Sequence, residues 1–318
     1  MSPSATLAKV VVVGAGIVGA TIAYALITKG LVQKLGLINR SPERAEGEAM
    51  DLNHCLAFTD PADIQAGGYE LCQDAQIVII TAGAAQKEGE TRLDLCAKNA
   101  RIVRSVVREV MPHNPEPIFL VVTNPVDVLT RVVLDESGLP PERVIGSGTV
   151  LDTARFRYLI SHHCRVDVRN VHGYALGEHG DSEVLAWSRL NVAGVLFHEY
   201  CGEVCKRGCP MHFRDAIDKD VRNAGYEIIQ KKGSTYYAVS LAVARIAKAI
   251  LKDQKSVLTV SSMMRGQYGM EDVCLSLPCV LGTSGVETVV DSPLDEAEEQ
   301  ALRRSAATLR ESFGSIGL

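Results

Sequence analysis

Residues 10–20 read VVVVGAGIVGA, a run of four valines followed by glycines at Gly14, Gly16 and Gly19. The valines predict a short buried strand, and the glycines predict a turn into a helix that runs from Gly19 to about Thr28. Gly14 allows the tight turn, Gly16 lets the backbone approach a pyrophosphate, and Gly19 lets the helix pack on the strand. The start of the helix also offers unpaired N–H groups to an anion. This stretch therefore predicts a dinucleotide-binding site.

Strands alternate with helices through the first half of the chain, an order that predicts βαβ units and a parallel sheet. The expected strands are 10–13, 35–38, 77–81 and 118–123, and the expected helices are 19–28, 42–53, 93–110 and 127–137. The second half carries long amphipathic helices at 152–160, 213–230, 235–251 and 294–313, and strands near 257–262 and 274–281. We therefore expect an α/β protein: a Rossmann doubly wound parallel sheet over 1–147, followed by an α+β catalytic domain over 148–318, with a cleft between them.

The composition excludes several classes of protein. A chain of 318 residues with 47% hydrophobic and 22% charged residues can bury a sizeable core, which argues against disorder. Its 33 basic and 38 acidic residues give a net charge of −5, so we expect neither nucleic acid nor a membrane surface as a partner. The apolar run 10–27 is interrupted by glycines, which argues against a transmembrane helix or a signal peptide.

The nine cysteines are too sparse for a disulfide scaffold, and none stands in CxxC spacing, so we expect reduced thiols in a cytoplasmic protein. Cys201, Cys205 and Cys209 stand four residues apart, on one side of a helix, which raises the alternative of a metal site. No histidine stands beside them in zinc spacing, and the glycines and the proline among them disfavour a regular helix. We expect structural or incidental thiols and no bound metal.

The cofactor preference depends on the end of the second expected strand. A dinucleotide fingerprint usually places an acidic residue there, about 20 positions on, to bind the adenosine ribose. This chain has Asn39 followed by Arg40. Asparagine removes the charge that would repel a 2′-phosphate, and the arginine offers a counter-charge. We expect NAD as the cofactor, with NADP tolerated.

Four further motifs carry polar side chains suited to chemistry on a small acid. They are GAAQKEGETR at 83–92, TNPVD at 123–127, LDTAR at 151–155 and GEHGDS at 177–182. Together with the glycine stretch, and at these spacings, they resemble the bacterial L-lactate dehydrogenases within the lactate and malate dehydrogenase family. The resemblance runs from about Val10 to the C-terminal helix. It implies a cytoplasmic homotetramer that moves a hydride reversibly between NADH and pyruvate, giving L-lactate.

The resemblance assigns the proton relay and the substrate clamp to three residues. His179 would be the general acid in keto-acid reduction, with Asp152 fixing its tautomer and stabilising the imidazolium. Arg155 stands three residues after Asp152, on the same helical face, and would hold the substrate carboxylate in a two-point salt bridge. A planar guanidinium fits this role better than lysine.

The same resemblance implies a lid over about 84–92. Gly83 and Gly89 would give it hinge freedom, and its closure would bring Arg92 onto the ketone oxygen and expel water. Gln86 stands where malate-preferring relatives have arginine, which pairs with the second carboxylate of oxaloacetate. A neutral glutamine leaves that charge unpaired, so we expect pyruvate and lactate as substrates.

Two alternative functions remain at this point. One is a malate or other 2-hydroxyacid dehydrogenase, separated from the first reading by Gln86. The other is a nucleotide-sensing protein that kept the fold and lost catalysis, since a fold alone does not give a function. That alternative predicts a damaged relay, whereas His179, Asp152, Arg92 and Arg155 are all present.

Further contacts follow from the resemblance. Thr235 matches the pocket threonine of the family, and Asn124 matches the residue that places nicotinamide and substrate, next to a prolyl bond that is often cis in relatives. The implied cofactor contacts are Gly14, Gly16, Ile17, Val18, Gly19, Asn39, Arg40, Arg44, Tyr69, Gly83, Ala84, Ser105, Val122, Asn124 and Ser147.

Arg157 and His172 imply a second anion site. In bacterial L-lactate dehydrogenases this arginine and this histidine contact fructose 1,6-bisphosphate at a subunit interface. A phosphate would neutralise two facing cationic patches and favour the active assembly. We therefore expect activation by fructose 1,6-bisphosphate, and the alternative is that both residues are ordinary interface or surface groups.

Overall fold

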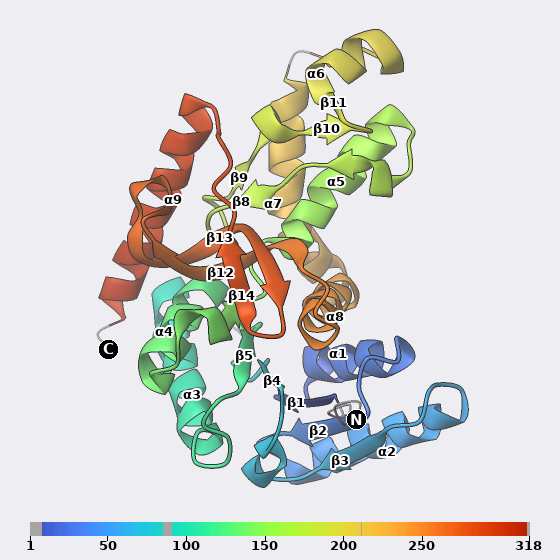
Figure 1. The fold of residues 1–318 in the computed structure, drawn as a ribbon, viewed down its shortest axis with the longest axis vertical. Coiled ribbons are helices and arrows are strands. Elements are labelled where there is room, and N and C mark those ends of the chain that lie inside the picture. Colours follow the sequence, from blue (N-terminus) through green and yellow to red (C-terminus); the bar gives the residue numbers. More distant parts are fainter. Residues whose placement is uncertain (1–7, 85–90, 211, 317–318) are drawn as a thin grey trace, which may run out of the picture.

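In the computed structural model, which describes residues 8–84, 91–210 and 212–316, a nine-stranded sheet runs through the centre of the molecule (Figure 1). Six of its strands are parallel, in the order β3-β2-β1-β4-β5-β6. They are β1 (Lys9–Val13), β2 (Lys34–Ile38), β3 (Asp63–Ala66), β4 (Ile77–Ile80), β5 (Ile118–Val121) and β6 (Val144–Gly146). The order reverses between β1 and β4, the point at which a Rossmann sheet binds its dinucleotide. The predicted fold class is confirmed.

Helices cover both faces of this sheet, because alternate strand residues point to opposite sides. Val10 and Val12 pack with α1 (Ile17–Thr28), α2 (Pro42–His54) and α8 (Tyr237–Leu251). Val11 and Val13 pack with α3 (Arg92–Val110), α4 (Val126–Ser137) and α9 (Glu296–Ser315). All four valines are buried, so the valine run forms a strand at the heart of both cores.

The second half of the chain adds three antiparallel strands to the same sheet. They are β12 (Ser256–Arg265), β13 (Glu271–Gly282) and β14 (Gly285–Val289). β12 joins β6 through the pair Ser261 and Gly146, where a side chain at Gly146 would collide with Thr130. Helices α8 and α9 of the second half also pack against α1 and α4 of the first half. The two halves therefore share one sheet and its covering helices.

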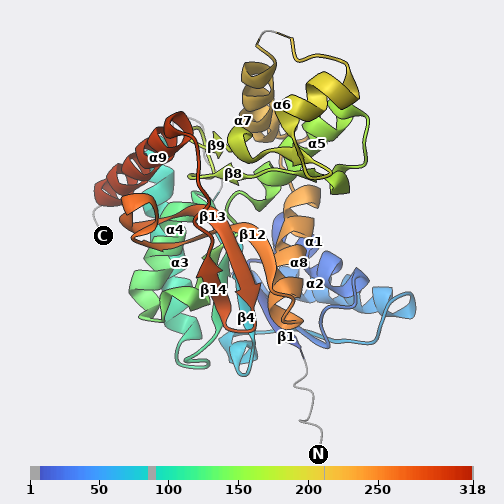
Figure 2. The same ribbon diagram turned by 45° about the horizontal axis from the view of Figure 1, so that its top comes forward.

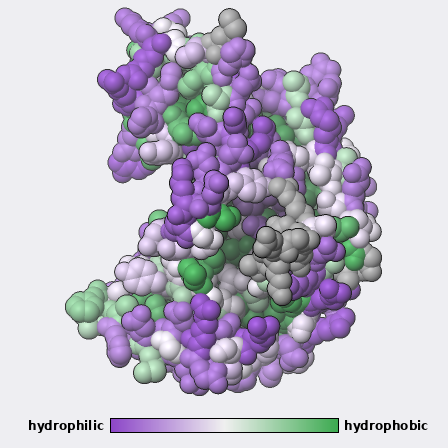
Figure 3. Space-filling view, turned by 180° about the vertical axis from the view of Figure 1, so that it is seen from behind, coloured by the Kyte–Doolittle hydropathy of each residue, from purple (hydrophilic) through white to green (hydrophobic). Residues whose placement is uncertain are grey.

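A smaller lobe stands above the sheet in Figures 1 and 2. Its helices are α5 (Val150–Cys164), α6 (Phe197–Glu199) and α7 (Phe213–Lys232), and a π-helix follows α6 at Tyr200–Cys205. Its short strands are β7 (Val171–His172), β8 (Ala175–Leu176), β9 (Val184–Leu185), β10 (Asn191–Val192) and β11 (Val195–Leu196). Phe156, Leu190 and Phe197 lie in a separate buried cluster here. Seen from behind, hydrophobic residues gather around a hollow in the middle of a mostly hydrophilic face (Figure 3).

The structure corrects several predicted bounds. β3 was not predicted because Ile64 is its one buried residue, and β14 likewise buries one residue of five. β6 and the two-residue strands are too short to show a clear pattern. Helix α1 begins at Ile17 rather than Gly19, and α8 begins at Tyr237, so Thr235 lies in the connection before it. Within the described ranges, no helix combines the length and the apolar composition needed to span a membrane.

Candidate active site

A cavity of about 1050 Å³ lies between the parallel sheet and the smaller lobe. Asn124, just after β5, lines one side of it, and Asp152 and Arg155 on α5 line another. His179 reaches the cavity from the loop after β8, and Thr235 from the connection before α8. Expected cofactor contacts that also line it are Val122, Asn124 and Ser147. The fold thus brings residues of separate sequence motifs to one place.

His179 and Asp152 form a close pair in this cavity. The Nδ1 atom of His179 lies 2.5 Å from Oδ2 of Asp152. The Asp152 side chain is 3% exposed and the His179 side chain 26% exposed, so the imidazole is the more accessible of the two. Because Nδ1 is engaged by the carboxylate, Nε2 is the nitrogen left to meet a ligand.

Each member of the pair shifts the pKa of the other. The Asp152 carboxylate raises the pKa of His179 to about 9, against burial, which lowers it. Burial pushes the pKa of Asp152 upward, but the charge and hydrogen bond of His179, and then those of Arg155, outweigh it and leave this pKa lowered. At neutral pH the pair therefore holds an imidazolium beside a carboxylate, which is the protonation state of a proton donor.

Arg155 occupies the second oxygen of the same carboxylate. Its Nη1 donates to Oδ1 of Asp152 at 2.6 Å, as the spacing of three residues on one helix predicts. The Arg155 side chain is 16% exposed and lines the cavity. Among the described residues, no further hydrogen bond is seen from the guanidinium, so its remaining N–H donors can meet an anionic ligand.

The loop that carries His179 is fixed at two points. Gly177 has a φ of +85° and exchanges backbone hydrogen bonds of 2.9 Å with Ser276 on β13. The backbone N–H of His179 donates to Oδ2 of Asp127 at 2.7 Å. Asp127 is buried at the start of α4, and burial raises the pKa of its carboxyl to about 6. Asp127 belongs to the TNPVD motif at 123–127, but the sequence alone indicated no role for it.

Glu183 and Arg222 also line the cavity and were missed from the sequence. Glu183 is 3% exposed, and its Oε1 has no hydrogen-bond partner among the described residues. Burial, and then the charge of Asp152, raises the pKa of Glu183 to about 8. Arg222 on α7 donates to the backbone carbonyl of Glu183 at 3.0 Å. Glu183 could have been identified from the sequence because it directly follows the GEHGDS motif.

Asn99 on α3 is another residue that the sequence did not reveal. It is 2% exposed, and its Oδ1 accepts from the N–H of Ala84 at 2.8 Å. Its Nδ2 donates to the backbone carbonyl of Asn124 at 2.9 Å. One buried amide therefore links Ala84 to the turn after β5, where the Asn124–Pro125 peptide bond is cis.

The three glycines of the fingerprint have distinct surroundings at the carboxyl end of β1. Gly14 has a φ of +113°, and a Cβ there would lie 2.5 Å from the backbone nitrogen of Ala82. A Cβ on Gly19 would collide with the carbonyl oxygen of Gly14, whereas a Cβ on Gly16 would meet no atom within 4 Å. Gly16 precedes α1, whose first turn has neither an acidic residue nor a side-chain cap. This open, uncapped helix start fits a pyrophosphate.

Comparison with known proteins agrees with this geometry. Residues 8–146 match the lactate/malate dehydrogenase NAD binding domain, and residues 149–316 match the lactate/malate dehydrogenase alpha/beta C-terminal domain. The chain belongs to the lactate/malate dehydrogenase family. It is 51% identical to an L-lactate dehydrogenase of Acetivibrio thermocellus over 318 residues, which is 100% of each chain. It is also 51% identical to L-lactate dehydrogenase 1 of Clostridium acetobutylicum over 308 residues, 97% of this chain and 98% of the other.

A solved structure of an L-lactate dehydrogenase has a similar fold to this chain. The crystal structure of the minor L-lactate dehydrogenase from Enterococcus mundtii, in a ligand-bound form, matches with a TM-score of 0.94 and 44% identity, over 98% of this chain and 99% of the other. The sequence-based assignment to bacterial L-lactate dehydrogenases and the expected class, an NAD-dependent oxidoreductase, are confirmed. NAD is likewise confirmed as the cofactor of this family member.

The expected adenosine-side contacts of the family lie beyond β2 and β3. Asn39 follows β2, and its Nδ2 donates to the carbonyl of Ser41 at 3.3 Å. Arg40 and Arg44 are exposed, and Tyr69 is half-buried in a short turn of 3₁₀-helix. Of the other expected contacts, Ile17, Gly83 and Ser105 are exposed, and Val18 and Ala84 are half-buried. The residue that follows β2 is therefore asparagine, where a dinucleotide fingerprint usually has an acidic residue.

The predicted lid falls mostly outside the described residues. Gln86 and Gly89 both lie in the range 85–90, which the structure does not describe. Beyond it, Thr91 caps α3 in a reciprocal pair of hydrogen bonds with Asp94, and Arg92 is the first residue of that helix. The roles of Gln86 and Arg92 therefore stay predictions from the family resemblance.

Arg157 and His172 lie on neighbouring segments of the smaller lobe. The Nε of Arg157 donates to the backbone carbonyl of Gly173 at 2.9 Å, next in sequence to His172. The Arg157 guanidinium lies 5.2 Å from the centre of the Tyr174 ring. Burial lowers the pKa of Arg157. His172, on β7, is exposed, so its imidazole faces away from the core of the lobe.

The cysteines of the 201–209 segment lie closer together than sequence spacing alone suggested. Cys201 and Cys205 belong to the π-helix, and Cys209 follows it with its Sγ 3.0 Å from that of Cys201. Burial, and then the charge and hydrogen bond of Cys205, raise the pKa of the Cys164 thiol to about 12. His163 on α5 lies beside Cys201, although it stands 38 residues before Cys201 in the sequence. All nine cysteines are free thiols, as expected.

Proposed function

We propose that the protein is an NAD-dependent L-lactate dehydrogenase that transfers a hydride reversibly between NADH and pyruvate. The observation that carries this proposal is the shared Asp152 carboxylate, which holds His179 on one oxygen and Arg155 on the other in a cavity beside the dinucleotide fold. A proton donor and a carboxylate clamp at this separation suit a small 2-keto acid. L-lactate dehydrogenases from two bacteria cover nearly the full chain at 51% identity.

Three residues have separate roles in the proposed reaction. NAD, when bound, supplies or accepts the hydride. Arg155 binds the substrate carboxylate through its free N–H donors, which orients the ketone carbon. His179 gives its Nε2 proton to the ketone oxygen as the hydroxyl forms, and Asp152 stabilises the imidazolium before that step. Such proton transfer contributes about 10²–10⁴ in rate.

Other residues complete the proposed site. Arg92 polarises the ketone oxygen when the lid over 84–92 closes, and closure excludes water. Thr235 and Asn124 line the cavity and hold the substrate and the nicotinamide end of the cofactor. The cofactor pyrophosphate lies over Gly16 at the start of α1, where there is room for it. The domains meet near Ser147, with a cofactor domain over 1–147 and a catalytic domain over 148–318.

The substrate choice rests on Gln86 and separates two enzymes of one family. A malate dehydrogenase needs a cation for the second carboxylate of oxaloacetate, and a neutral glutamine at the lid position leaves that charge unpaired. We therefore assign pyruvate and L-lactate, with malate or another 2-hydroxy acid as the second candidate.

The direct test is loss of NADH absorbance on addition of pyruvate to the purified protein, with oxaloacetate assayed in parallel. The proposal expects a higher kcat/KM for pyruvate than for oxaloacetate. A higher value for oxaloacetate would replace the first candidate with the second. No turnover of either acid would point to a binding protein that has lost catalysis.

Activation by fructose 1,6-bisphosphate is a separate part of the proposal. Arg157 and His172 lie on adjoining segments at the surface of the smaller lobe, where a phosphate of the effector would meet both. The proposed assembly is a cytoplasmic homotetramer in which these residues face a partner subunit. Pyruvate saturation curves should shift to lower concentration with the bisphosphate, and Arg157→Leu with His172→Ala should remove that shift. Sedimentation velocity with and without effector checks the tetramer, and curves that do not move would end the activation proposal.

A further inference from the structure

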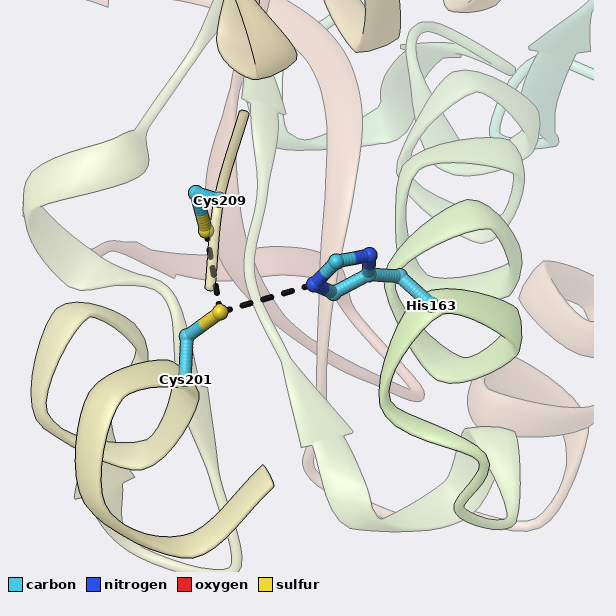
Figure 4. Close-up of side chains that lie close together, drawn as sticks. All are labelled: His163, Cys201 and Cys209. Carbon is cyan, nitrogen blue, oxygen red and sulfur yellow. Dashed lines mark hydrogen bonds between the residues drawn. The ribbon is translucent and has the colours of Figure 1, made fainter. Parts of the chain in front are cut away.

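His163, Cys201 and Cys209 bring one imidazole and two thiols together on the smaller lobe (Figure 4). The Nε2 atom of His163 lies 3.4 Å from Sγ of Cys201, and Sγ of Cys209 lies 3.0 Å from the same sulfur. All three donor atoms fall within 4.8 Å of one another. They come from the end of α5, from the π-helix and from the segment after it, so three separate pieces of backbone converge.

These distances approach those of a tetrahedral zinc site. With Zn–S near 2.3 Å and Zn–N near 2.0 Å, a thiolate and an imidazole nitrogen on one ion lie about 3.5 Å apart and two thiolates about 3.8 Å apart. The distance between Nε2 of His163 and Sγ of Cys201 is 3.4 Å, close to the value of about 3.5 Å for a zinc site. The two sulfurs must separate by under 1 Å. Cys209 is exposed on the segment after the π-helix, so it can make that adjustment.

The surroundings orient the imidazole toward the sulfurs. The His163 ring lies 4.4 Å from the centre of the Phe213 ring and 6.3 Å from that of Phe197. Arg207 donates to the backbone carbonyl of His163 at 3.3 Å, which ties the segment after the π-helix to α5. Aromatic packing thus holds the ring plane, while its Nε2 stays directed at Cys201.

Cys205 is a further thiol on the same segment, outside the group of three. Cys205 stands one π-helical turn after Cys201 and is half-buried, and its thiol hydrogen-bonds with Cys164, where it helps to raise that pKa. Three thiolates and a neutral imidazole around a divalent ion carry a net charge of −1. The Arg207 guanidinium next to His163 offsets that charge.

We propose that His163, Cys201 and Cys209 bind a thiophilic divalent cation of the Zn²⁺ type, with Cys205 completing a tetrahedral set. This reverses the expectation from sequence, which found no histidine in zinc spacing. The histidine comes instead from 38 residues before Cys201, so the spacing rule could not show it. Nothing in the proposal depends on the substrate of the enzyme.

A disulfide between Cys201 and Cys209 is the competing explanation for two close sulfurs. A disulfide needs two sulfurs at about 2.0 Å and gives no role to an imidazole nitrogen or to further thiols. Here the imidazole contacts the central sulfur. One ion explains all three groups of the cluster, whereas a disulfide explains two.

The position of the site indicates a structural role. His163 stands eleven residues after Asp152 on α5, about 16 Å along the helix at 1.5 Å per residue. The ion therefore lies away from the reacting atoms. It would hold the 201–209 segment against the end of α5. Because α7 follows this segment and carries Arg222, the ion would also restrict the position of Arg222 in the active-site cavity. Structural zinc sites of this kind have four protein ligands.

The test uses the full chain, purified in reductant, stripped with a chelator and titrated with Co²⁺ as a spectroscopic probe and with Zn²⁺. We expect one ion per chain and a thiolate-to-cobalt charge-transfer band with tetrahedral d–d bands. Cys209→Ser and His163→Phe should each weaken binding by more than about a hundredfold, beyond the 10–100-fold that the loss of an outer-shell partner usually costs. Phenylalanine keeps the ring packing of His163 and removes only the donor nitrogen.

Cys55→Ser is the matched control, since Cys55 directly follows α2, a helix that lies far from this lobe in Figure 1. It should bind the ion like the parent chain. Zn²⁺ should raise the unfolding temperature of the parent and the control, and leave Cys209→Ser unchanged. Unchanged ion-free unfolding temperatures show that the variants fold.

Three results would overturn the proposal. One is a reduced parent chain that binds neither ion. Another is an unaltered cobalt spectrum in the Cys201→Ser, Cys209→Ser double variant. The third is a Cys201–Cys209 disulfide found by peptide mass mapping in protein isolated without reductant, together with no ion binding after reduction. An unaltered spectrum in Cys205→Ser would remove that residue as the fourth ligand.

Discussion

The Nδ1 atom of His179 lies 2.5 Å from the Oδ2 atom of Asp152, and the other oxygen of that carboxylate accepts from a guanidinium at 2.6 Å. One buried side chain therefore aligns the proposed proton donor and the proposed substrate clamp. The same carboxylate sets the charge state of the imidazole, because it is the largest contribution that raises the His179 pKa.

The first prediction concerns pH. Pyruvate reduction needs His179 protonated, and Asp152 raises the pKa of His179 from 6.5 to about 9. The kcat/KM for pyruvate should hold level through neutral pH and fall as the pH rises through about 9, and the kcat/KM for lactate oxidation should rise over the same range. Initial rates in both directions across this range check the signs.

Asp152→Asn tests the cause of that profile. Without the carboxylate, burial remains and the largest cause that raises the His179 pKa is lost, so this pKa should fall and the drop in pyruvate reduction should move to lower pH. The rate at neutral pH should fall by about 10²–10⁴. Asp167→Asn is the control, because Asp167 is an exposed carboxylate paired with Arg169 outside the cavity. A profile that stays in place in Asp152→Asn would refute the assignment.

The second prediction concerns Arg155→Lys. Lysine keeps the charge but cannot offer two parallel N–H donors, and it gives up the bond to Asp152. The KM for pyruvate should rise by about 10–100-fold, as expected when hydrogen bonds to a charged group are lost. Arg169→Lys, at an exposed site, should leave KM unchanged. A KM for Arg155→Lys within a few times that of the parent would count against the clamp.

The third prediction compares two glycines of the fingerprint. Gly16→Ala should fold normally, since its methyl group meets no protein atom within 4 Å, but the KM for NADH should rise because that methyl occupies the proposed pyrophosphate position. Gly14→Ala should instead lower the unfolding temperature, because Gly14 has a φ of +113° and a Cβ would lie 2.5 Å from the Ala82 nitrogen. Equal NADH binding by Gly16→Ala and the parent would place the cofactor elsewhere.

The sequence predicted those parts of the fold and the site that depend on local patterns. The valine run and the three glycines determine a strand, a turn and a helix within 20 residues, so the start of the Rossmann fold was predictable. The LDTAR spacing likewise placed Asp152 and Arg155 on one helical face, as the structure has them.

The remaining features depend on contacts between distant segments. Asn99 resembles any polar helix residue until the fold places Ala84 and Asn124 against it. The pairing of β12 with β6 rests on a single close approach at Gly146, which carries no periodic signal. His163 lies beside Cys201 only after α5 and the π-helix have packed together. Sequence spacing along one element cannot report such contacts.

The fourth prediction concerns the adenosine end of the cofactor. Asn39 places no negative charge after β2, and Arg40 is exposed next to it. The preference for NADH over NADPH in kcat/KM should stay below about a thousandfold, or some 4 kcal/mol of discrimination. Asn39→Asp should increase that preference by repelling the 2′-phosphate, and Arg40→Ala should increase it by removing a counter-charge. A parent preference above that limit would contradict the expectation that NADP is tolerated.

The fifth prediction concerns Gln86 and the choice between two acids. Gln86→Arg should raise kcat/KM for oxaloacetate relative to pyruvate by about 10–100-fold, because a guanidinium would pair with the second carboxylate that glutamine leaves unpaired. Gln65→Arg adds the same charge at an exposed position on β3 and should not change the ratio. The comparison separates a local contact from the general effect of added positive charge on an anionic substrate.

The ratio of the two kcat/KM values is the informative quantity for Gln86→Arg, because Arg155, the proposed clamp, would contact a carboxylate that both substrates share. Loss of Arg155 should lower both rates together, whereas Gln86→Arg should move them apart. If the Gln86→Arg ratio equals that of the parent, the lid position does not set specificity. The choice of substrate would then have to come from the cavity wall itself, where Thr235 is the first residue to test.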